Sequence, residues 1–145
     1  MEKTIKIING FDNILKVIQE FSQCFYTLKT GKVNTLQIAE KLSKKGIVLG
    51  LSVNGKILGF AAFYANDFTD KTAYLSLFAV ASQYRKMGYG KALIDEVVSK
   101  SRNAGMDKII LQVLNKNTGA ISFYQKIGFN ITRNIEETCF MEKMI

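Results

Sequence analysis

The sequence predicts a mixed α/β (α+β) fold, with a mostly antiparallel sheet of six to seven strands and helices on both of its faces. Short apolar runs bounded by turn residues indicate the strands, and amphipathic segments with apolar residues at helical spacing indicate the helices. A strand and two helices come first, then a hairpin, a further strand and two alternations of helix and strand. The 145 residues suit one compact domain over residues 1–145.

The first third of the chain predicts one strand and two helices. Residues 3–9 alternate polar with apolar side chains, as a half-buried strand does. Asp12 or Asn13 can cap a helix whose apolar positions are Ile14, Val17, Ile18, Phe21 and Phe25. Asn34 or Thr35 can begin a second helix, which ends at Gly46 and carries the apolar residues Leu36, Ile38, Ala39 and Leu42.

The middle of the chain predicts a hairpin and a central strand. Residues 47–53 and 56–65 flank Asn54-Gly55, which is the strongest short signal for a β-hairpin. Residues 72–80 form the next strand, and their mostly apolar character predicts that it is central in the sheet.

The remaining elements alternate. Residues 88–104 predict a long helix stopped by Gly105, residues 108–114 a strand, and residues 117–127 a helix. Residues 129–133 and 138–144 then predict a closing hairpin.

Composition excludes several kinds of chemistry. The chain has no histidine, and its two cysteines, Cys24 and Cys139, are too far apart for a metal motif or a disulfide framework. We therefore expect no metal and no Ser-His or Cys-His nucleophile. Any base or acid must be Tyr, a carboxylate, Cys, Lys or an ordered water.

The formal net charge of +8 raises the question of nucleic acid, but the basic residues are dispersed along the chain. We expect no nucleic-acid partner. No apolar run approaches the roughly 18 residues of a membrane span, and the N-terminus lacks the apolar core of a signal peptide. The sequence thus predicts no membrane association and a cytoplasmic location.

The segment Arg85-Lys86-Met87-Gly88-Tyr89-Gly90 connects a predicted strand directly to a predicted helix. The first amides of a helix have no intrahelical partner, and the helix dipole adds positive charge there. Glycines let a phosphate approach the backbone. The segment therefore predicts an anion cradle for a diphosphate, although a simple tight turn explains two glycines equally well. Neither a P-loop nor a three-glycine dinucleotide motif is present.

A second segment, residues 117–129, predicts a helix capped by Asn117 or Thr118 and ended by Gly128. One face of this helix carries Ala120, Phe123, Tyr124 and Ile127. Taken alone, Tyr124 reads as a half-buried helical aromatic residue.

Together the two segments resemble the Gcn5-related N-acetyltransferase (GNAT) family. Its first signature, a Gln or Arg followed by two spaced small residues, is matched by Arg85, Gly88 and Gly90. Its second signature is matched by Asn117, Ala120, Phe123, Tyr124, Lys126, Gly128 and Phe129. The resemblance is dense from Ala73 to Phe129 and thin elsewhere. It implies acetyl transfer from acetyl-CoA to a primary amine, directly and in a ternary complex.

The resemblance also implies roles for individual residues. The pyrophosphate of coenzyme A would be held by residues 85–91, which are Arg85, Lys86, Met87, Gly88, Tyr89, Gly90 and Lys91. The pantetheine arm would insert between two splayed strands and pair with the main chain of Phe78, Ala79 and Val80. Asn117 would contact this arm, or act only as the helix cap. Tyr124 would be the general acid for the leaving thiolate, and the N–H of Phe78 or Val80 would stabilise the oxyanion.

The general base departs from the family pattern, because Tyr74 stands where many members carry a glutamate. Asp67, Asp70, Glu136, Glu137 or a water relay through Ser76 remain open as alternatives. The acceptor also remains open between a small amine, an amino sugar and a peptide. Two further alternatives are a protein N-acetyltransferase and a non-catalytic sensor of coenzyme A. A homodimer is compatible with the family, and the aromatic candidates for acceptor contacts are Tyr26, Tyr64, Phe68 and Tyr74.

Overall fold

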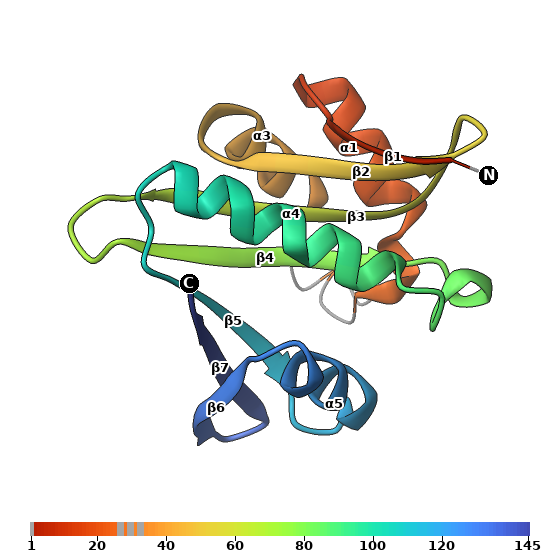
Figure 1. Cartoon of the computed structure of the whole chain (residues 1–145). Helices are drawn as coiled ribbons and strands as arrows, with labels where there is room; N and C mark the ends of the chain where they lie inside the picture. The colour runs from red at the N-terminus through yellow and green to blue at the C-terminus, as the bar shows by residue number, and fades with distance from the viewer. Residues whose placement is uncertain (1, 26–27, 29–30, 32–33) are drawn as a thin grey trace.

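The computed structural model describes residues 2–25, 28, 31 and 34–145 (Figure 1). Within this described part, seven strands form one sheet in the order β1-β2-β3-β4-β5-β7-β6. All neighbouring strands are antiparallel except β4 and β5, which are parallel. The predicted mixed and mostly antiparallel sheet is confirmed, and β4 lies at its centre as expected.

The strands are β1 (Lys3–Ile7), β2 (Ile47–Val53), β3 (Lys56–Asp67), β4 (Thr72–Val80), β5 (Lys108–Leu114), β6 (Asn130–Ile135) and β7 (Thr138–Met144). The helices are α1 (Phe11–Glu20), α3 (Thr35–Lys45), α4 (Tyr89–Asn103) and α5 (Thr118–Lys126), with short 3-10 helices η1 (Ser22–Cys24) and η2 (Ser82–Tyr84). None of the described helices combines the length and the apolarity needed to cross a membrane.

Most predicted element boundaries agree with the structure to within two residues. Asn34 caps α3 by accepting hydrogen bonds from the N–H groups of Leu36 and Gln37 at 2.9 and 3.3 Å. Asn54 and Gly55 both adopt positive φ, at 53° and 78°, which a tight two-residue hairpin turn requires.

The start of α1 differs from the prediction. The cap is Gly10 rather than Asp12 or Asn13, and its φ of 88° favours glycine. The Asn13 side chain donates backwards to the carbonyl of Asn9 at 3.0 Å, so it does not serve a later amide. The helix also ends at Glu20, and Phe25 lies beyond η1, where its ring packs edge-on against Phe60.

Helices cover both faces of the sheet, as predicted (Figure 1). On one face, α1 and α3 pack against β2, β3 and β4 in a cluster that includes Ile18, Leu42 and Phe60; we call it the α1/α3 core. On the other face, α4 and α5 pack in a second cluster that includes Leu93 and Tyr124, which we call the α4/α5 core. The two cores therefore sandwich the central strands.

A β-bulge at Ser76 divides β4 into two halves. Ala62 of β3 lies opposite Leu77, whereas the next residue, Phe63, lies opposite Leu75, so Ser76 is the extra residue. The bulge reverses the alternation of side chains. Leu75 consequently points into the α4/α5 core, and Leu77 points into the α1/α3 core.

Ser101 gives a stability prediction. Its Oγ is buried under α4 and has no hydrogen-bond partner among the described residues. Leaving a buried hydroxyl unpaired costs about 1–3 kcal/mol. We therefore expect Ser101→Ala to raise the free energy of unfolding, measured in urea, by about 1 kcal/mol.

Ser99 provides the control, because it lies on the same helix and is exposed. Both substitutions gain the same helix propensity, so the difference between them isolates the buried hydroxyl. If Ser101→Ala is less stable than Ser99→Ala, the hydroxyl contributes a favourable interaction and the prediction is wrong.

Candidate functional site

Strands β4 and β5 pair only at one end. Their register joins Thr72 to Lys108, Ala73 to Ile109 and Tyr74 to Ile110, and no pairs follow within the described strands. Both strands continue, to Val80 and to Leu114, while β5 runs away from β4 (Figure 1). The two central strands thus diverge, and we call the region between residues 76–80 and 111–114 the divergence.

Main-chain groups face the divergence from both sides. The Ala81 N–H donates to Leu58 O at 2.8 Å, and antiparallel ladders alternate every second residue, so Ala79 and Leu77 direct their main chains to β3. Phe78 and Val80 therefore direct theirs to the divergence. On β5, the Asn115 N–H donates to Glu137 O at 2.8 Å, so Val113 and Leu111 direct their main chains to β7. The main chains of Gln112 and Leu114 therefore face the divergence.

An extended ligand carrying amides could pair with these groups, since main-chain donors and acceptors require partners when buried. Of the three residues expected to contact the arm, Phe78 and Val80 are placed to do so, whereas the Ala79 main chain faces β3. The side chains of β5 gave no indication in the sequence that this strand contributes to the site. Strand β5 contributes main-chain groups, which the identity of its side chains does not reveal.

Helix α4 begins where β4 and η2 end. Gly88 is its N-cap with a φ of 83°, and no side chain caps the first turn among the described residues. The backbone of Lys86 also adopts a left-handed conformation, with a φ of 65°. The first intrahelical bond runs from the Ala92 N–H to Gly88 O at 3.1 Å, so the earlier amides remain available. A surface that exposes uncapped amides and carries no acidic residue in its first turn suits an anion.

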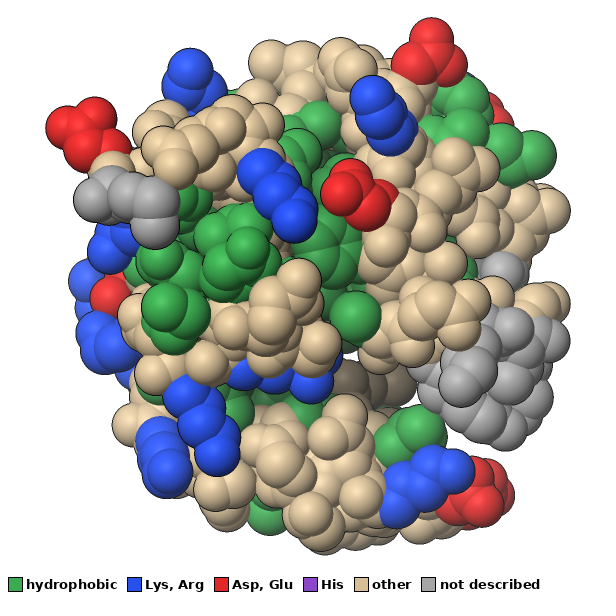
Figure 2. All heavy atoms as spheres, turned by 90° about the vertical axis from the view of Figure 1, so that its right-hand side faces the viewer, with side chains coloured by type: hydrophobic (Ala, Val, Ile, Leu, Met, Phe, Trp, Pro, Cys, Tyr) green, Lys and Arg blue, Asp and Glu red, His purple; other side chains and the backbone are tan. Residues whose placement is uncertain are grey.

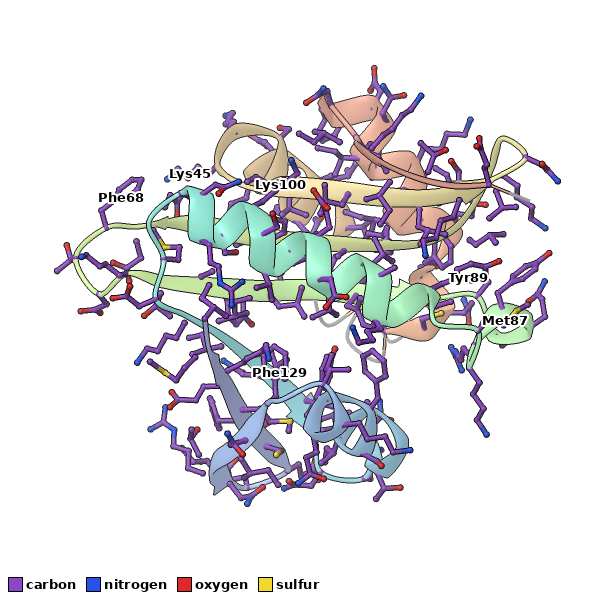
Figure 3. All side chains as sticks on the ribbon, in the orientation of Figure 1. Lys45, Phe68, Met87, Tyr89, Lys100 and Phe129 are labelled. Carbon is purple, nitrogen blue, oxygen red and sulfur yellow. The ribbon has the colours of Figure 1, made fainter. Side chains whose placement is uncertain are left out.

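The start of α4 lies at one end of the molecule, where Met87 and Tyr89 project from the turn (Figure 3). Met87 is exposed. Viewed from this end, the surface is hollowed between the upper and lower halves of the molecule (Figure 2). The cradle residues and the divergence therefore open on the same side.

The basic side chains of the cradle have structural partners. Arg85 Nε donates to Val80 O at 3.0 Å and so ties the turn to the end of β4. Lys91 Nζ lies 2.9 Å from Asp95 Oδ2, and both side chains are exposed. The positive charge offered to an anion thus comes from the helix start, the exposed Lys86 and the charge of the Arg85 guanidinium. The main-chain amides supply most of the expected contacts.

An aromatic cluster joins β4, α4 and α5. The rings of Phe78 and Phe123 are stacked, with their centroids 5.6 Å apart and an angle of 11° between their planes. The centroid of the Tyr124 ring lies 6.1 Å from that of Phe78. A Cβ on Gly90 would lie 3.1 Å from Phe123 Cζ and 3.2 Å from Phe78 Cζ. A side chain at this position would therefore force the two rings to shift by a few tenths of an ångström, a constraint that the sequence did not reveal.

Tyr124 is buried, with 9% of its surface exposed, and its ring packs edge-on against Phe123 and Phe129. Burial raises the pKa of its hydroxyl well above the usual value of 10. The hydroxyl is therefore protonated at neutral pH and can donate a proton.

Asn117 caps α5, because its Oδ1 accepts from the Ala120 N–H at 3.2 Å. The predicted cap is thereby confirmed. Gly128 follows the helix with a φ of 104°, as expected for the residue after the helix end.

The carboxylates considered as bases are exposed; Asp67 ends β3, whereas Asp70, Glu136 and Glu137 lie in turns. Asp67 Oδ1 accepts from the Asp70 N–H at 3.1 Å, and Glu136 sits at positive φ in the β6–β7 turn. Tyr74 is half-buried on the α1/α3 side of β4, and burial raises its pKa. Tyr26 lies outside the described residues. The structure thus brings Tyr124, Phe78 and the cradle together around the divergence, whereas Glu136 and Glu137 lie in the exposed β6–β7 turn.

Comparison with known proteins agrees with this architecture. A model of the acetyltransferase (GNAT) family matches residues 14–129. The ribosomal protein bS18-alanine N-acetyltransferase of Escherichia coli K12 is 33% identical over 91 residues, which are 61% of this chain and 60% of that protein. The chain thus matches less than two thirds of that relative's length.

Solved structures show the same fold. The crystal structure of the ribosomal-protein-S18-alanine N-acetyltransferase of Escherichia coli has a TM-score of 0.79 at 22% identity, covering 99% of this chain and 94% of that one. The PaiA N-acetyltransferase of Thermoplasma acidophilum, solved in complex with coenzyme A, has a TM-score of 0.78 at 19% identity and full coverage of both chains. With the family model spanning most of the sequence, the chain belongs to the acetyltransferase (GNAT) family.

Proposed function

We propose that the protein is an acetyl-CoA-dependent N-acetyltransferase that moves an acetyl group directly to a primary amine. The observation that carries the proposal is the divergence of β4 and β5 after three paired residues, with the uncapped start of α4 at its mouth. A ligand with a diphosphate and an amide-containing arm matches both features. We propose that residues 1–145 act as one domain in this role.

The roles of the residues follow from their positions. The amides of Gly88, Tyr89 and Gly90 hold the diphosphate, and the main chains of Phe78 and Val80 pair with the arm of the cofactor. The N–H of Phe78 or Val80 stabilises the oxyanion that forms at the thioester carbonyl. Tyr124 supplies a proton to the departing thiolate, because its raised pKa keeps it protonated throughout the neutral range.

Among the candidate acceptors we favour a peptide amine, because the relative from Escherichia coli is named for the alanine of a ribosomal protein. A small amine or an amino sugar is the alternative. A sensor that binds coenzyme A without catalysis would use the same cradle, and turnover separates the two. Three expectations remain predictions: that the protein is cytoplasmic, that it uses no metal, and that it has no nucleic-acid partner.

Two measurements test this function. Acetyl-CoA at 100 times its Kd should stabilise the protein by about 2.7 kcal/mol and raise its Tm accordingly. Release of free thiol should then be followed with peptides, small amines and amino sugars as acceptors. A larger Tm shift with an oligonucleotide than with acetyl-CoA would refute the proposal, and thermal stabilisation without any thiol release would favour the sensor.

A further inference from the structure

A second hollow lies on the α1/α3 side of the sheet, beside the point where β4 and β5 begin to diverge. It encloses about 270 Å³ and is lined by Lys41, Lys45, Tyr64, Asp67, Tyr74 and Ile110, among others. Tyr74 and Ile110 form the last pair between β4 and β5. The hollow therefore adjoins the inner end of the divergence, at the opposite end of the molecule from Met87 and Tyr89 (Figure 3).

The position of the hollow fits an acceptor site. A cofactor arm that enters at the start of α4, with its thioester at the N–H of Phe78 or Val80, points along β4 toward Tyr74, which lies four residues, roughly 13 Å, beyond Phe78 at the usual rise of a strand. The α4/α5 side of the divergence is filled by the rings of Phe78, Phe123 and Tyr124. An acceptor must therefore reach the inner end from the α1/α3 side, where the hollow lies.

The charges around the hollow are unbalanced. Neither Lys41 nor Lys45 has a carboxylate within 4.0 Å among the described residues, whereas the neighbouring Lys44 pairs with Glu40 at 2.9 Å. Lys41 Nζ lies 5.1 Å from the centre of the Tyr64 ring. Asp67 contributes one carboxylate, which already accepts the Asp70 N–H at 3.1 Å. Two ammonium groups thus face one engaged carboxylate.

The two tyrosines add neutral donors. Tyr64 and Tyr74 lie directly opposite each other on β3 and β4, so their side chains share the α1/α3 face. Burial raises the pKa of both hydroxyls, and the proximity of Tyr74 raises that of Tyr64 further. Both hydroxyls are therefore protonated at neutral pH and can donate to an anion.

We propose that this hollow binds a carboxylate of the acceptor and that Lys41 and Lys45 thereby select acidic amines, such as a peptide with an acidic residue next to its N-terminus. The inference rests on the proposed N-acetyltransferase function and names its substrate class. The volume lies just below the roughly 300–1,000 Å³ typical of ligand sites, which suits a single side chain or a terminal carboxylate.

The expected selectivity is modest, because both lysines are exposed. An exposed ion pair changes affinity by less than about fivefold, so two together give a preference of about tenfold. The preference should weaken as salt rises, since exposed charges are screened.

The test compares three peptides that share a free α-amine: Ala-Glu-Ala amide, Ala-Gln-Ala amide and Ala-Gln-Ala with a free C-terminal carboxylate. Each is titrated calorimetrically into the protein saturated with coenzyme A, which carries no acetyl group and permits no turnover. We expect one of the two acidic peptides to bind about tenfold more tightly than the neutral one, and which of them does so tells a side-chain from a terminal carboxylate.

The double variant Lys41→Gln/Lys45→Gln should lose this preference, while Lys44→Gln on the same helix should keep it. Equal affinities of the wild-type protein for the three peptides would overturn the inference, as would a preference that survives in the double variant. The titration measures binding without catalysis. A failure of thiol release with acetyl-CoA would therefore count against the proposed function, whereas the titration alone tests the selectivity of the hollow.

Discussion

Replacing Tyr124 with phenylalanine is expected to lower kcat by about 100-fold or more, because a positioned general acid contributes at least that factor. The Kd for acetyl-CoA should change little, since the cradle and the main chains along the divergence remain intact. The measurement is the steady-state rate of thiol release with saturating acetyl-CoA and acceptor, together with a calorimetric Kd for the cofactor.

The structure adds a second readout for this variant. The Tyr124 side chain is only 9% exposed, but among the described residues Ser101 Oγ alone is a fully buried polar side-chain atom without a partner, so removal of the Tyr124 hydroxyl should change the free energy of unfolding by less than about 1 kcal/mol. Tyr84→Phe is the matched control, because Tyr84 lies in η2 and outside the aromatic cluster. Unchanged turnover in Tyr124→Phe would mean that Tyr124 serves only packing.

Replacing Gly88 with aspartate is expected to weaken acetyl-CoA binding by about 100-fold or more. The new carboxylate would stand at the cap of α4, where it would both bond to the free amides and repel the diphosphate. Each charge-assisted hydrogen bond contributes about 1.5–3 kcal/mol, so the loss of two of them lowers affinity by about 100-fold or more. Calorimetric titration of acetyl-CoA provides the measurement.

Controls separate charge from strain. A Cβ at Gly88 meets no atom within 4 Å, so the cost of the substitution is the positive φ, about 1–2 kcal/mol. Gly105 has the same properties at the other end of α4, with a φ of 91° and open space around its Cβ position. Gly105→Asp should therefore lose similar stability and keep the wild-type Kd, and Gly88→Asn should bind more tightly than Gly88→Asp. Retained affinity in Gly88→Asp would remove the cradle from the proposed site.

Local patterns predicted most of the fold. The hairpin at Asn54-Gly55, the Asn34 and Asn117 caps and the strand Thr72–Val80 each depend on residues close in sequence, and each is found where the pattern placed it. The turn into α4 was predicted for the same reason, since positive φ at Gly88 is a property of that residue and its neighbours.

The features that depend on distant residues could not be predicted in this way. Nothing in residues 72–80 marks Ser76 as a bulge, because the bulge exists only relative to the register of β3. Arg85 was expected to help to hold the pyrophosphate as one of residues 85–91, and the sequence did not reveal that its Nε also donates to the carbonyl of Val80, which becomes reachable only when η2 turns the chain back. The hollow beside Tyr74 combines residues of α3, β3, β4 and β5, so it arises only in the folded sheet.

The central claim is that the main chain at the start of α4 binds the diphosphate of coenzyme A, and calorimetric titration of acetyl-CoA into the folded wild-type protein tests it most directly. The account predicts saturable heat at one site per chain, lost in Gly88→Asp and kept in Gly105→Asp. A titration without binding heat, on protein that unfolds cooperatively, would contradict it.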